Sequence, residues 1–399
     1  STSRRQRQMC IRDRRSIMSI YEEAHALQPT LVSWRRYFHQ HAEGGYDLPQ
    51  TLTLIRDVLT AHHVSFSEPC PSTLVAEIGT GPAGMILRAD MDALLMEEKS
   101  GLPFASETAF AHTCGHDFHT AMLLGAACLL QAHADELKTR TRLIFQPDEE
   151  NITGARQLIE HRLVTPDFQG AFAIHMSPAM ESSRLYYKNG PMYAASNEFV
   201  ITVTGASTRG AAPANGRDPI FAAVQIYNAL QGLMSRERPT LEPAVLSICA
   251  FNGGNTVNVI PEKAELLGTL RTYNTALAEQ IKERIQDICN GIAITQRCQV
   301  QLTYTTTVPA ICNDTALNQR ILQTMHTAAP EVLVQEQTEP FAWSEDFALF
   351  GNILPISMMS LGAHVTGCNA NLHNADVLFD ENALAVGAAA HVCAALSAT

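Results

Sequence analysis

The chain of 399 residues is poor in positive charge: 28 lysines and arginines stand against 40 aspartates and glutamates, a formal net charge of −12. Nucleic-acid binding depends on basic surfaces that displace counterions from phosphate, and no basic stripe runs through the body of the sequence. The chain also has no apolar run near the roughly 20 residues of a membrane span and no secretory h-region. We therefore expect small-molecule partners, and neither nucleic acid nor membrane.

Paired cysteines are also missing. The ten cysteines are scattered without paired spacing, and a chain of this length can bury a large core without disulfides. We expect a reducing, cytoplasmic compartment, and a chain of two domains or of one large domain with an insertion.

Positive charge gathers only in residues 1–17, which hold six arginines and one aspartate. A basic arm that binds nucleic acid or membrane is one interpretation. We expect instead a tail that is non-native or disordered, because hydrophobic periodicity begins only after Met18, which would serve as an initiator.

From there, helical and strand patterns alternate. Helices are expected over 31–40, 48–63, 117–137 and 151–163, and strands over 73–79, 84–90, 141–146 and 170–175. This order is typical of an α/β sandwich with a mostly parallel sheet, in which active sites lie beyond the carboxyl ends of the strands.

The middle of the chain has a different order. Strands are expected over 196–205, 244–254, 263–274 and 300–307, and helices over 218–235 and 276–292. This β-α-β-β-α-β order is that of the ferredoxin-like unit. We therefore expect an α/β, two-domain chain: a catalytic domain made of residues 18–188 and 306–399, interrupted by an inserted α+β domain, 189–305.

The segment "HTCGHDFHTA" (112–121) concentrates metal-ligating side chains. Cys114 and His116 come just before the long helix, where a loop can aim both side chains at one point. Thiolate and imidazole are strong ligands for zinc-like divalent ions. Either residue alone could equally be structural.

Two strand ends and a loop supply further candidates. "FQPDEE" (145–150) ends in Glu149 and Glu150, "FAIHM" (172–176) contains His175, and His373 lies in a loop before the final helix. The acidic run alone could be a solvated helix N-terminus, which the helix dipole favours. The coincidence of all four segments at strand ends and loops predicts a metal site.

These motifs together resemble one family. "RADMDAL" (88–94), "HTCGHDFHTA", "FQPDEE", "AIHM", "NVIPE" (258–262), "SEDFALF" (344–350) and "LHNADVLFDEN" (372–382) occur in the order found in a metal-dependent amidohydrolase and peptidase family. That family includes hippurate hydrolases, N-acyl-amino-acid amidohydrolases and the plant enzymes that cleave auxin conjugates. The resemblance extends from Trp34 to the end of the chain.

The resemblance implies two divalent ions, manganese, zinc, cobalt or nickel, and an acyl-amino acid substrate. The implied ligands are Cys114, His116, Glu150, His175 and His373. Paired ions generate a nucleophile from water at neutral pH, and Glu149 would be the general base that carries the proton to the leaving amine.

Other polar residues are candidates for supporting roles. Asp90 and Asp92 are expected to orient ligand imidazoles, as carboxylates commonly do, and Asp117 or His119 could do likewise. Capping of a strand end is the alternative for both Asp90 and Asp92. No role is expected for His39.

The resemblance further implies that the insertion is a lid through which the protein forms a homodimer. Asn258 and Arg271 would then meet a substrate carboxylate or a developing oxyanion, since a guanidinium pairs well with a carboxylate. A salt bridge on the strand face is the alternative for Arg271.

One stretch departs from the family pattern. Where members usually carry a lid histidine, this chain reads "GASTRGAAP" (205–213), which places Arg209 there, or Thr208 after a shift of one residue. The loss of an oxyanion donor typically costs about 10²–10³ in rate. A catalytically weak protein that retains metal and binds ligand is therefore the alternative function, and an aminopeptidase or dipeptidase of the same fold is another. Asp148, beside the base, is a lesser departure whose charge would raise the pKa of Glu149.

Overall fold

The computed structural model describes residues 18–399, so the predicted tail, 1–17, lies outside the described part. The described chain divides into two compact units. The first contains the residues up to Gly190, Cys312–Thr338 and Leu349–Thr399, and the second contains Pro191–Ile311 and Glu339–Ala348. The second unit thus includes a short segment, 339–348, that the sequence analysis assigned to the catalytic domain.

The first unit is built on an eight-stranded sheet in the order β1-β2-β6-β3-β7-β18-β8-β17. Its strands are β1 (Phe66–Ser67), β2 (Leu74–Ile78), β3 (Ala83–Asp90), β6 (Arg140–Gln146), β7 (Gly170–Ser177), β8 (Arg184–Tyr187), β17 (Leu333–Glu336) and β18 (Ile356–Gly362). The central strands β6, β3, β7 and β18 run parallel. They are almost wholly buried, as strands covered on both faces must be. The predicted α/β class with a mostly parallel sheet is confirmed.

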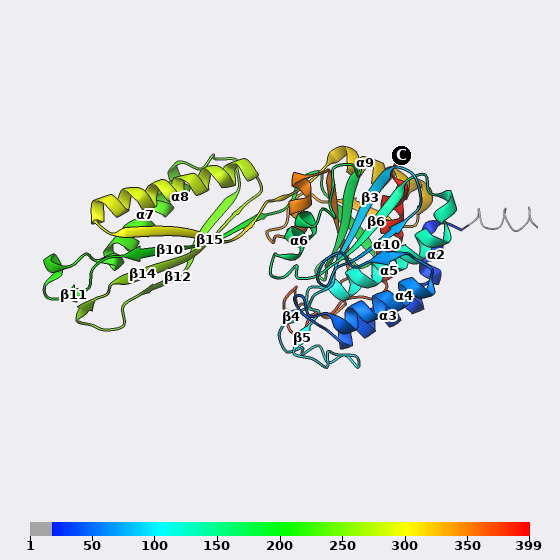
Figure 1. Cartoon of the computed structure of the whole chain (residues 1–399), viewed down its shortest axis with the longest axis horizontal. Helices are drawn as coiled ribbons and strands as arrows, with labels where there is room; N and C mark the ends of the chain where they lie inside the picture. The colour runs from blue at the N-terminus through cyan, green and yellow to red at the C-terminus, as the bar shows by residue number, and fades with distance from the viewer. Residues whose placement is uncertain (1–17) are drawn as a thin grey trace, which may run out of the picture. The chain divides into compact units, whose positions relative to one another are not determined.

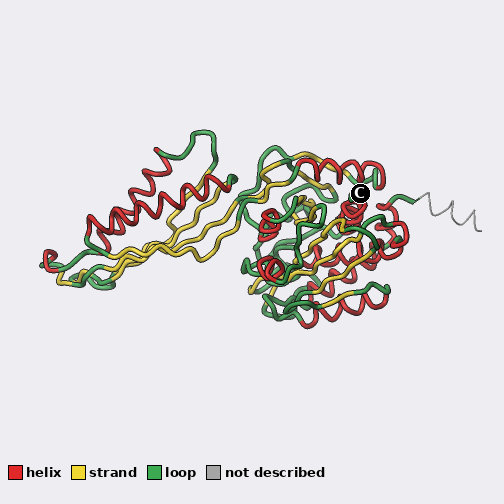
Figure 2. Tube along the Cα trace, turned by 45° about the horizontal axis from the view of Figure 1, so that its top comes forward, coloured by secondary structure: helices red, strands yellow, loops and turns green. Residues whose placement is uncertain are grey.

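Helices enclose this sheet (Figure 2). They are α2 (Ile20–Ala26), α3 (Gln28–Gln40), α4 (Pro49–Ala61), α5 (His116–Ala132), α6 (Gly154–Glu160), α9 (Thr315–Ala328) and α10 (Ala383–Leu396). α5 and α10 pack side by side against the strands, and α3 and α4 pack on the outside of α5 (Figure 1). Almost every residue of α5 and α10 is buried, as expected for helices that are apolar all round.

Two expected helices are shorter than predicted. α5 ends at Ala132 and is followed by a 3-10 turn, Ala134–Glu136. α6 begins only at Gly154, because Asp148 (φ 54°) and Ile152 (φ 60°) adopt left-handed backbone conformations, which cannot continue a right-handed helix.

The second unit has the predicted β-α-β-β-α-β order. Its main elements are β10 (Ala195–Thr204), α7 (Pro219–Arg236), β12 (Ala244–Gly253), β14 (Lys263–Thr272), α8 (Thr275–Gln296) and β15 (Gln299–Val308). The strands form an antiparallel sheet in the order β12-β14-β10-β15, and both helices lie on one face of it (Figure 1). Asp218 and Asn274 accept backbone N–H groups at the starts of the two helices.

Short elements complete the chain. They are β4 (Leu94–Leu95), β5 (Phe110–Ala111), β9 (Gly190–Tyr193), β11 (Thr208–Arg209), β13 (Val259–Ile260), β16 (Ile311–Asn313) and the 3-10 turns Pro213–Asn215 and Asp346–Asn352. In residues 18–399 no helix combines the length and apolar character needed to cross a bilayer.

Candidate metal centre

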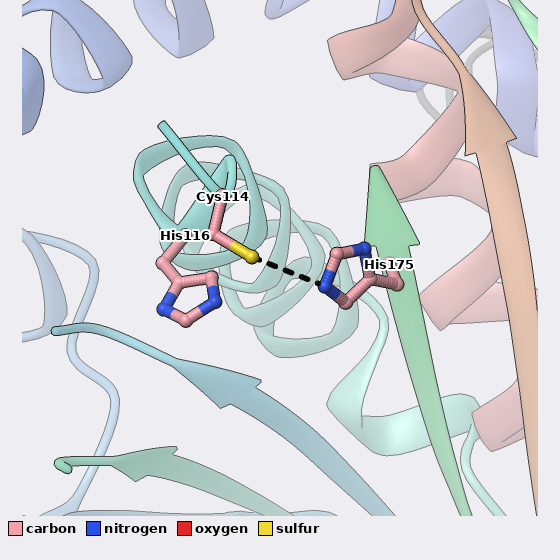
Figure 3. Close-up of side chains that lie close together, drawn as sticks. All are labelled: Cys114, His116 and His175. Atoms are coloured by element: carbon pink, nitrogen blue, oxygen red, sulfur yellow. Dashed lines mark hydrogen bonds between the residues drawn. The ribbon is translucent and has the colours of Figure 1, made fainter. Parts of the chain in front are cut away.

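The turn that starts α5 carries two of the predicted ligands. Gly115 caps the helix with φ 89°, and a Cβ at this position would lie 2.9 Å from the Cβ of Met176 on β7. Only glycine combines that conformation with so close an approach. The turn therefore presents Cys114 and His116 toward His175 at the end of β7, as Figure 3 shows.

Hydrogen bonds to the backbone orient the ligand imidazoles. His116 Nδ1–H donates to the carbonyl of Asp92 (2.7 Å), and His175 Nδ1–H donates to the carbonyl of Met176 (2.8 Å). A carbonyl oxygen can only accept, so the proton of each ring lies on Nδ1 and Nε2 faces the centre. Asp92 therefore contacts His116 through its backbone carbonyl and not through the carboxylate that was expected to do so.

The carboxylate of Asp92 binds the backbone of the two glutamates instead. Its two oxygens accept the backbone N–H groups of Glu149 (3.0 Å) and Glu150 (3.1 Å). This fixes the turn after β6, where Asp148 adopts φ 54° and its carboxylate accepts from Asn151 and Thr153. Both glutamates are thereby held at the carboxyl end of the parallel sheet.

The ligand atoms form overlapping groups, each with all its atoms within 4.8 Å of one another. One group is Cys114, His116 and His175, and another is Cys114, Glu150 and His373. Cys114 Sγ lies 3.5 Å from His175 Nε2 and 3.3 Å from His373 Nε2. The structure therefore brings together all five predicted ligands, with the thiol common to both groups.

Glu149 lies beside these groups. Its Oε2 is 3.9 Å from His116 Nε2, and Glu150 Oε1 is 3.8 Å from the same nitrogen. Glu149 is buried, whereas the side chain of His373 is 53% exposed. The cluster is thus open to solvent on the side of His373.

The charges of the cluster suit divalent cations. Burial, reinforced by Glu150, raises the pKa of the Cys114 thiol well above its usual range. Burial, with Asp92 and Asp90, raises the pKa of Glu150 to about 7 against the opposing effect of His116. Both shifts arise mainly from burial and are increased by neighbouring carboxylates, whose charge a cation would offset.

Two buried donor atoms of the cluster that lack hydrogen bonds also favour a bound cation. His116 Nε2 and Glu150 Oε1 are buried and have no hydrogen-bond partner. Burial favours neutral His116, yet Asp90 and Cys114 outweigh it and raise the pKa of this imidazole well above its usual range. A positive charge is therefore stabilised at the centre, and the set of sulfur, nitrogen and oxygen donors fits transition-metal ions.

The candidate substrate residues lie in the second unit. Arg209 on β11 pairs with Val259, and the carbonyl of Asn258 accepts the N–H of Gly210 (2.8 Å), so Arg209 and Asn258 are neighbours. Arg271 lies near the far end of β14, eight residues beyond Lys263 and thus roughly 26 Å along the strand at 3.3 Å per residue. Within this unit, Arg271 and Asn258 are not brought together.

Arg271 has one weak partner. Its guanidinium lies 3.8 Å from Glu198 Oε1, while Nη1 is buried without a hydrogen bond. The strand-face salt bridge weighed as the alternative is therefore present, but it leaves a donor of the guanidinium unused.

A buried network of hydrogen-bonded charged residues lies behind the metal centre and was not predicted from the sequence. Asp117 Oδ2 accepts from Arg35 Nε and from His39 Nδ1, both at 2.8 Å, and His39 Nε2 donates to Glu98 Oε1 (2.8 Å). Arg35 and His39 are four residues apart on α3 and so share one helix face. This spacing was the sign of the network that the sequence offered. The carboxylates that contact Arg35 and His39 come from distant segments of the chain.

The network predicts a pH-dependent effect on stability. His39 faces Asp117, Glu98, Arg35 and the ring of His112, 6.4 Å away. Burial lowers its pKa, but hydrogen bonds to Asp117 and Glu98 outweigh this and raise the pKa above the usual value. The stabilisation is therefore complete below the unfolded pKa of about 6.5 and is lost as pH rises through the folded pKa.

We accordingly expect His39→Gln to destabilise the protein by about 3 kcal/mol at pH 6, because two buried carboxylates lose their shared cation. The difference in melting temperature from wild type should shrink at pH 9. His41→Gln, on the same helix end, is the control, since its ring donates only to the carbonyl of Tyr37. An equal difference at both pH values would contradict the charged state of His39.

Comparison with known proteins decides the family. The model of peptidase family M20/M25/M40 matches residues 86–397, more than half of the chain. The chain belongs to this family. An M20-family chain hydrolyses amide bonds with the help of metal ions, so the predicted recognition and enzyme class are confirmed.

Individual relatives agree along nearly the whole chain. N-acetyl-L-cysteine deacetylase of Bacillus subtilis is 34% identical over 378 residues, which cover 92% of this chain and 89% of the relative. IAA-amino acid hydrolase ILR1-like 4 of Arabidopsis thaliana is 33% identical over 373 residues, covering 90% and 84%. The crystal structure of the Bacillus subtilis YXEP protein, a dinuclear metal-binding M20 peptidase, superposes with a TM-score of 0.80 at 30% identity, covering 93% and 98%.

Proposed function

We propose that this M20-family hydrolase cleaves the amide bond of N-acyl or N-aroyl amino acids, with Glu149 as general base and two divalent ions. The observation that carries the proposal is the convergence of four donor side chains around the thiol of Cys114, with Glu149 beside them. The relatives named above, a deacetylase of N-acetylcysteine and a hydrolase of IAA-amino acids, support this substrate class.

Cys114, His116, Glu150, His175 and His373 would hold the ions, and Cys114 belongs to both donor groups. Manganese, zinc, cobalt and nickel all suit these donors. When bound, such ions lower the pKa of water and polarise a carbonyl oxygen.

The chain's own residues supply positioning and proton transfer. The carboxylate of Asp92 accepts the backbone N–H of Glu149, which keeps the Glu149 carboxylate at the edge of the metal centre. Glu149 would take the proton from the attacking water and return it to the leaving amine, the general acid–base role of a carboxylate within reach of both.

The amino-acid half of the substrate carries a carboxylate. Arg271 would bind it, supported by the buried Nη1 that has no hydrogen bond and by the fit of guanidinium to carboxylate. Asn258 and Arg209, as neighbours, would serve the acyl end or the oxyanion. Because Arg271 lies far along β14 from Asn258 and Arg209, one copy of the unit does not offer both contacts to one small substrate molecule.

The test is a panel of N-acetyl, N-benzoyl and indole-acetyl amino acids beside dipeptides with a free amine. The protein is stripped with a chelator and assayed after manganese, zinc, cobalt or nickel is added back. Metal-restored cleavage of acyl-amino acids supports the proposal. Preference for free-amine dipeptides would make the protein an aminopeptidase or dipeptidase instead.

A second candidate function follows from Arg209. The residue is exposed on β11, and an arginine is longer than the family's histidine and permanently charged. A protein that binds metal and ligand but turns over slowly is the alternative. Full metal occupancy without cleavage of any panel member would favour it.

We expect Arg209→His to raise kcat on N-acetyl amino acids at least ~10-fold, since an oxyanion donor is typically worth about 10²–10³. Steady-state kinetics measure the change. Arg236→His, an exposed position on α7, is the matched control and should leave kcat unchanged. A fall in kcat for Arg209→His would make Arg209 an adapted substrate contact.

We also propose a homodimer through the second unit. Phe221, Val224 and Tyr227 are exposed along one side of α7, and β12, with exposed Val245, is an edge strand. Such apolar surface beside an open edge is typical of an interface. Light scattering should give twice the mass of one chain, and Phe221→Asp should reduce it to that of one chain; an unchanged mass would exclude this face.

Cytoplasmic location likewise remains a proposal, supported by the unpaired cysteines of the described chain.

A further inference from the structure

His119 lies one turn into α5, wholly buried beside the metal centre. Its ring centroid is 5.3 Å from that of His116 and 5.0 Å from that of His175. Together with Asp90 and His116 it also forms a group of potential metal donors. Proximity alone would therefore allow His119 to be a sixth ligand.

The hydrogen bonds of His119 exclude that role. The backbone N–H of Met176 donates to His119 Nε2 (2.9 Å), so this nitrogen carries no proton. The ring proton is then on Nδ1, which donates to Asp90 Oδ1 at 2.5 Å. Both nitrogens are engaged with protein groups, and neither has a lone pair left for a metal.

Asp90 is itself held in place. Its other oxygen accepts from Arg88 Nη1 (2.7 Å), and Arg88 Nε donates to Gln146 Oε1 (2.9 Å) at the end of β6. Arg88 and Asp90 are 1% and 0% exposed. A charge-assisted pair without competing water is a rigid support for the imidazole that it contacts.

The backbone of Met176 connects His119 to a ligand. Its N–H is bound by His119, and its carbonyl accepts the Nδ1–H of His175 (2.8 Å). We infer that His119, supported by Asp90 and Arg88, is a positioning residue that fixes the backbone at Met176 and thereby the ring of His175. The inference rests on the proposed function, in which His175 is a metal ligand. Asp90 therefore orients the imidazole of His119, which is not a metal ligand.

Two substitutions of similar size separate the two hydrogen bonds. In His119→Gln the side-chain carbonyl lies near the place of Nε2 and can accept from Met176 N–H. In His119→Asn the shorter amide lies near the place of Nδ1 and can donate to Asp90, but it does not reach Met176. Each variant thus keeps one bond and loses the other, and the inference expects the larger effect in His119→Asn, which loses the bond to Met176.

The first readout uses metal-free protein. We expect hydrogen exchange of the Met176 amide to be faster in His119→Asn than in wild type, and close to wild type in His119→Gln. The second readout is metal affinity, measured with Zn²⁺ or Mn²⁺ in competition with a chelator. We expect His119→Asn to bind 10–100-fold more weakly, the usual effect of removing a group that orients a ligand, and His119→Gln to restore most of the affinity.

Metal stoichiometry at saturation tests the ligand alternative. Both variants should bind as many ions as wild type; the loss of one equivalent in both would make His119 a ligand and overturn the inference. Equal exchange and affinity in the two variants would also overturn it, because the Met176 bond would then have no effect. His391→Gln, at a buried histidine of α10 whose Nδ1 has no partner, controls for lost stability and should keep wild-type affinity.

Failure of the proposed function can be distinguished from failure of the inference about His119. If His175→Ala keeps full metal affinity, His175 is not a ligand and the metal assignment falls. The exchange rate of the Met176 amide in metal-free protein still reports whether His119 holds the backbone at Met176.

Discussion

Replacing Glu149 with alanine should lower amide turnover by about 10³-fold while both metal ions stay bound. General acid–base catalysis by a positioned side chain contributes typically 10²–10⁴, and Glu149 lies beside the donor groups without being needed to complete either of the two that share Cys114. Steady-state kinetics on a cleaved acyl-amino acid, with metal content measured on the same sample, separate the two effects.

Asp148→Asn is the matched control for this variant. It removes the neighbouring carboxylate charge but keeps an oxygen that can accept from Asn151 and Thr153. We expect a change of less than about 10-fold, since it contacts no reacting group. A loss of metal in Glu149→Ala would make Glu149 a ligand, and unchanged turnover would remove it from the mechanism.

Replacing Cys114 with alanine should abolish binding of both ions at stoichiometric metal and reduce turnover to background. The thiol is common to both donor groups, so its removal leaves two donors in each, fewer than the three protein ligands of typical catalytic sites. Metal analysis after dialysis, and calorimetric titration with Zn²⁺ and Mn²⁺, measure the loss.

Cys128→Ala, on the helix α5 that follows Cys114, is the control. This thiol is also buried, with a pKa raised to about 12 by burial, but it lies three turns away from the metal centre. It should retain wild-type metal content and turnover. Full occupancy in Cys114→Ala would contradict the assignment of the thiol.

Much of this arrangement could be read from the sequence because it follows strand order. Glu149 and Glu150 closely follow β6, His175 lies near the end of β7, and parallel strands end at one edge of a sheet. His373, almost 200 positions further along, was a candidate from its place in a loop before the final helix, and the resemblance then implied that it is a ligand.

The supporting contacts could not be predicted in the same way. His116 is oriented by the backbone carbonyl of Asp92, and every residue carries such a carbonyl, so no side-chain pattern marks it. His39 reaches Glu98 and Asp117 only because α3 packs on α5. The separation of Asn258 from Arg271 likewise depends on how far β14 extends between them.

The path of the chain through the first unit has a consequence for its biosynthesis. β18 lies between β7 and β8 at the middle of the sheet, and α10 is buried on nearly all sides, yet both follow residue 348. The second unit, in contrast, is largely encoded between Pro191 and Ile311. Because chains fold as they emerge from the ribosome, we expect the second unit to fold while the first still waits for its last strand and helix, with apolar surface of α5 and β7 open to chaperones until translation ends.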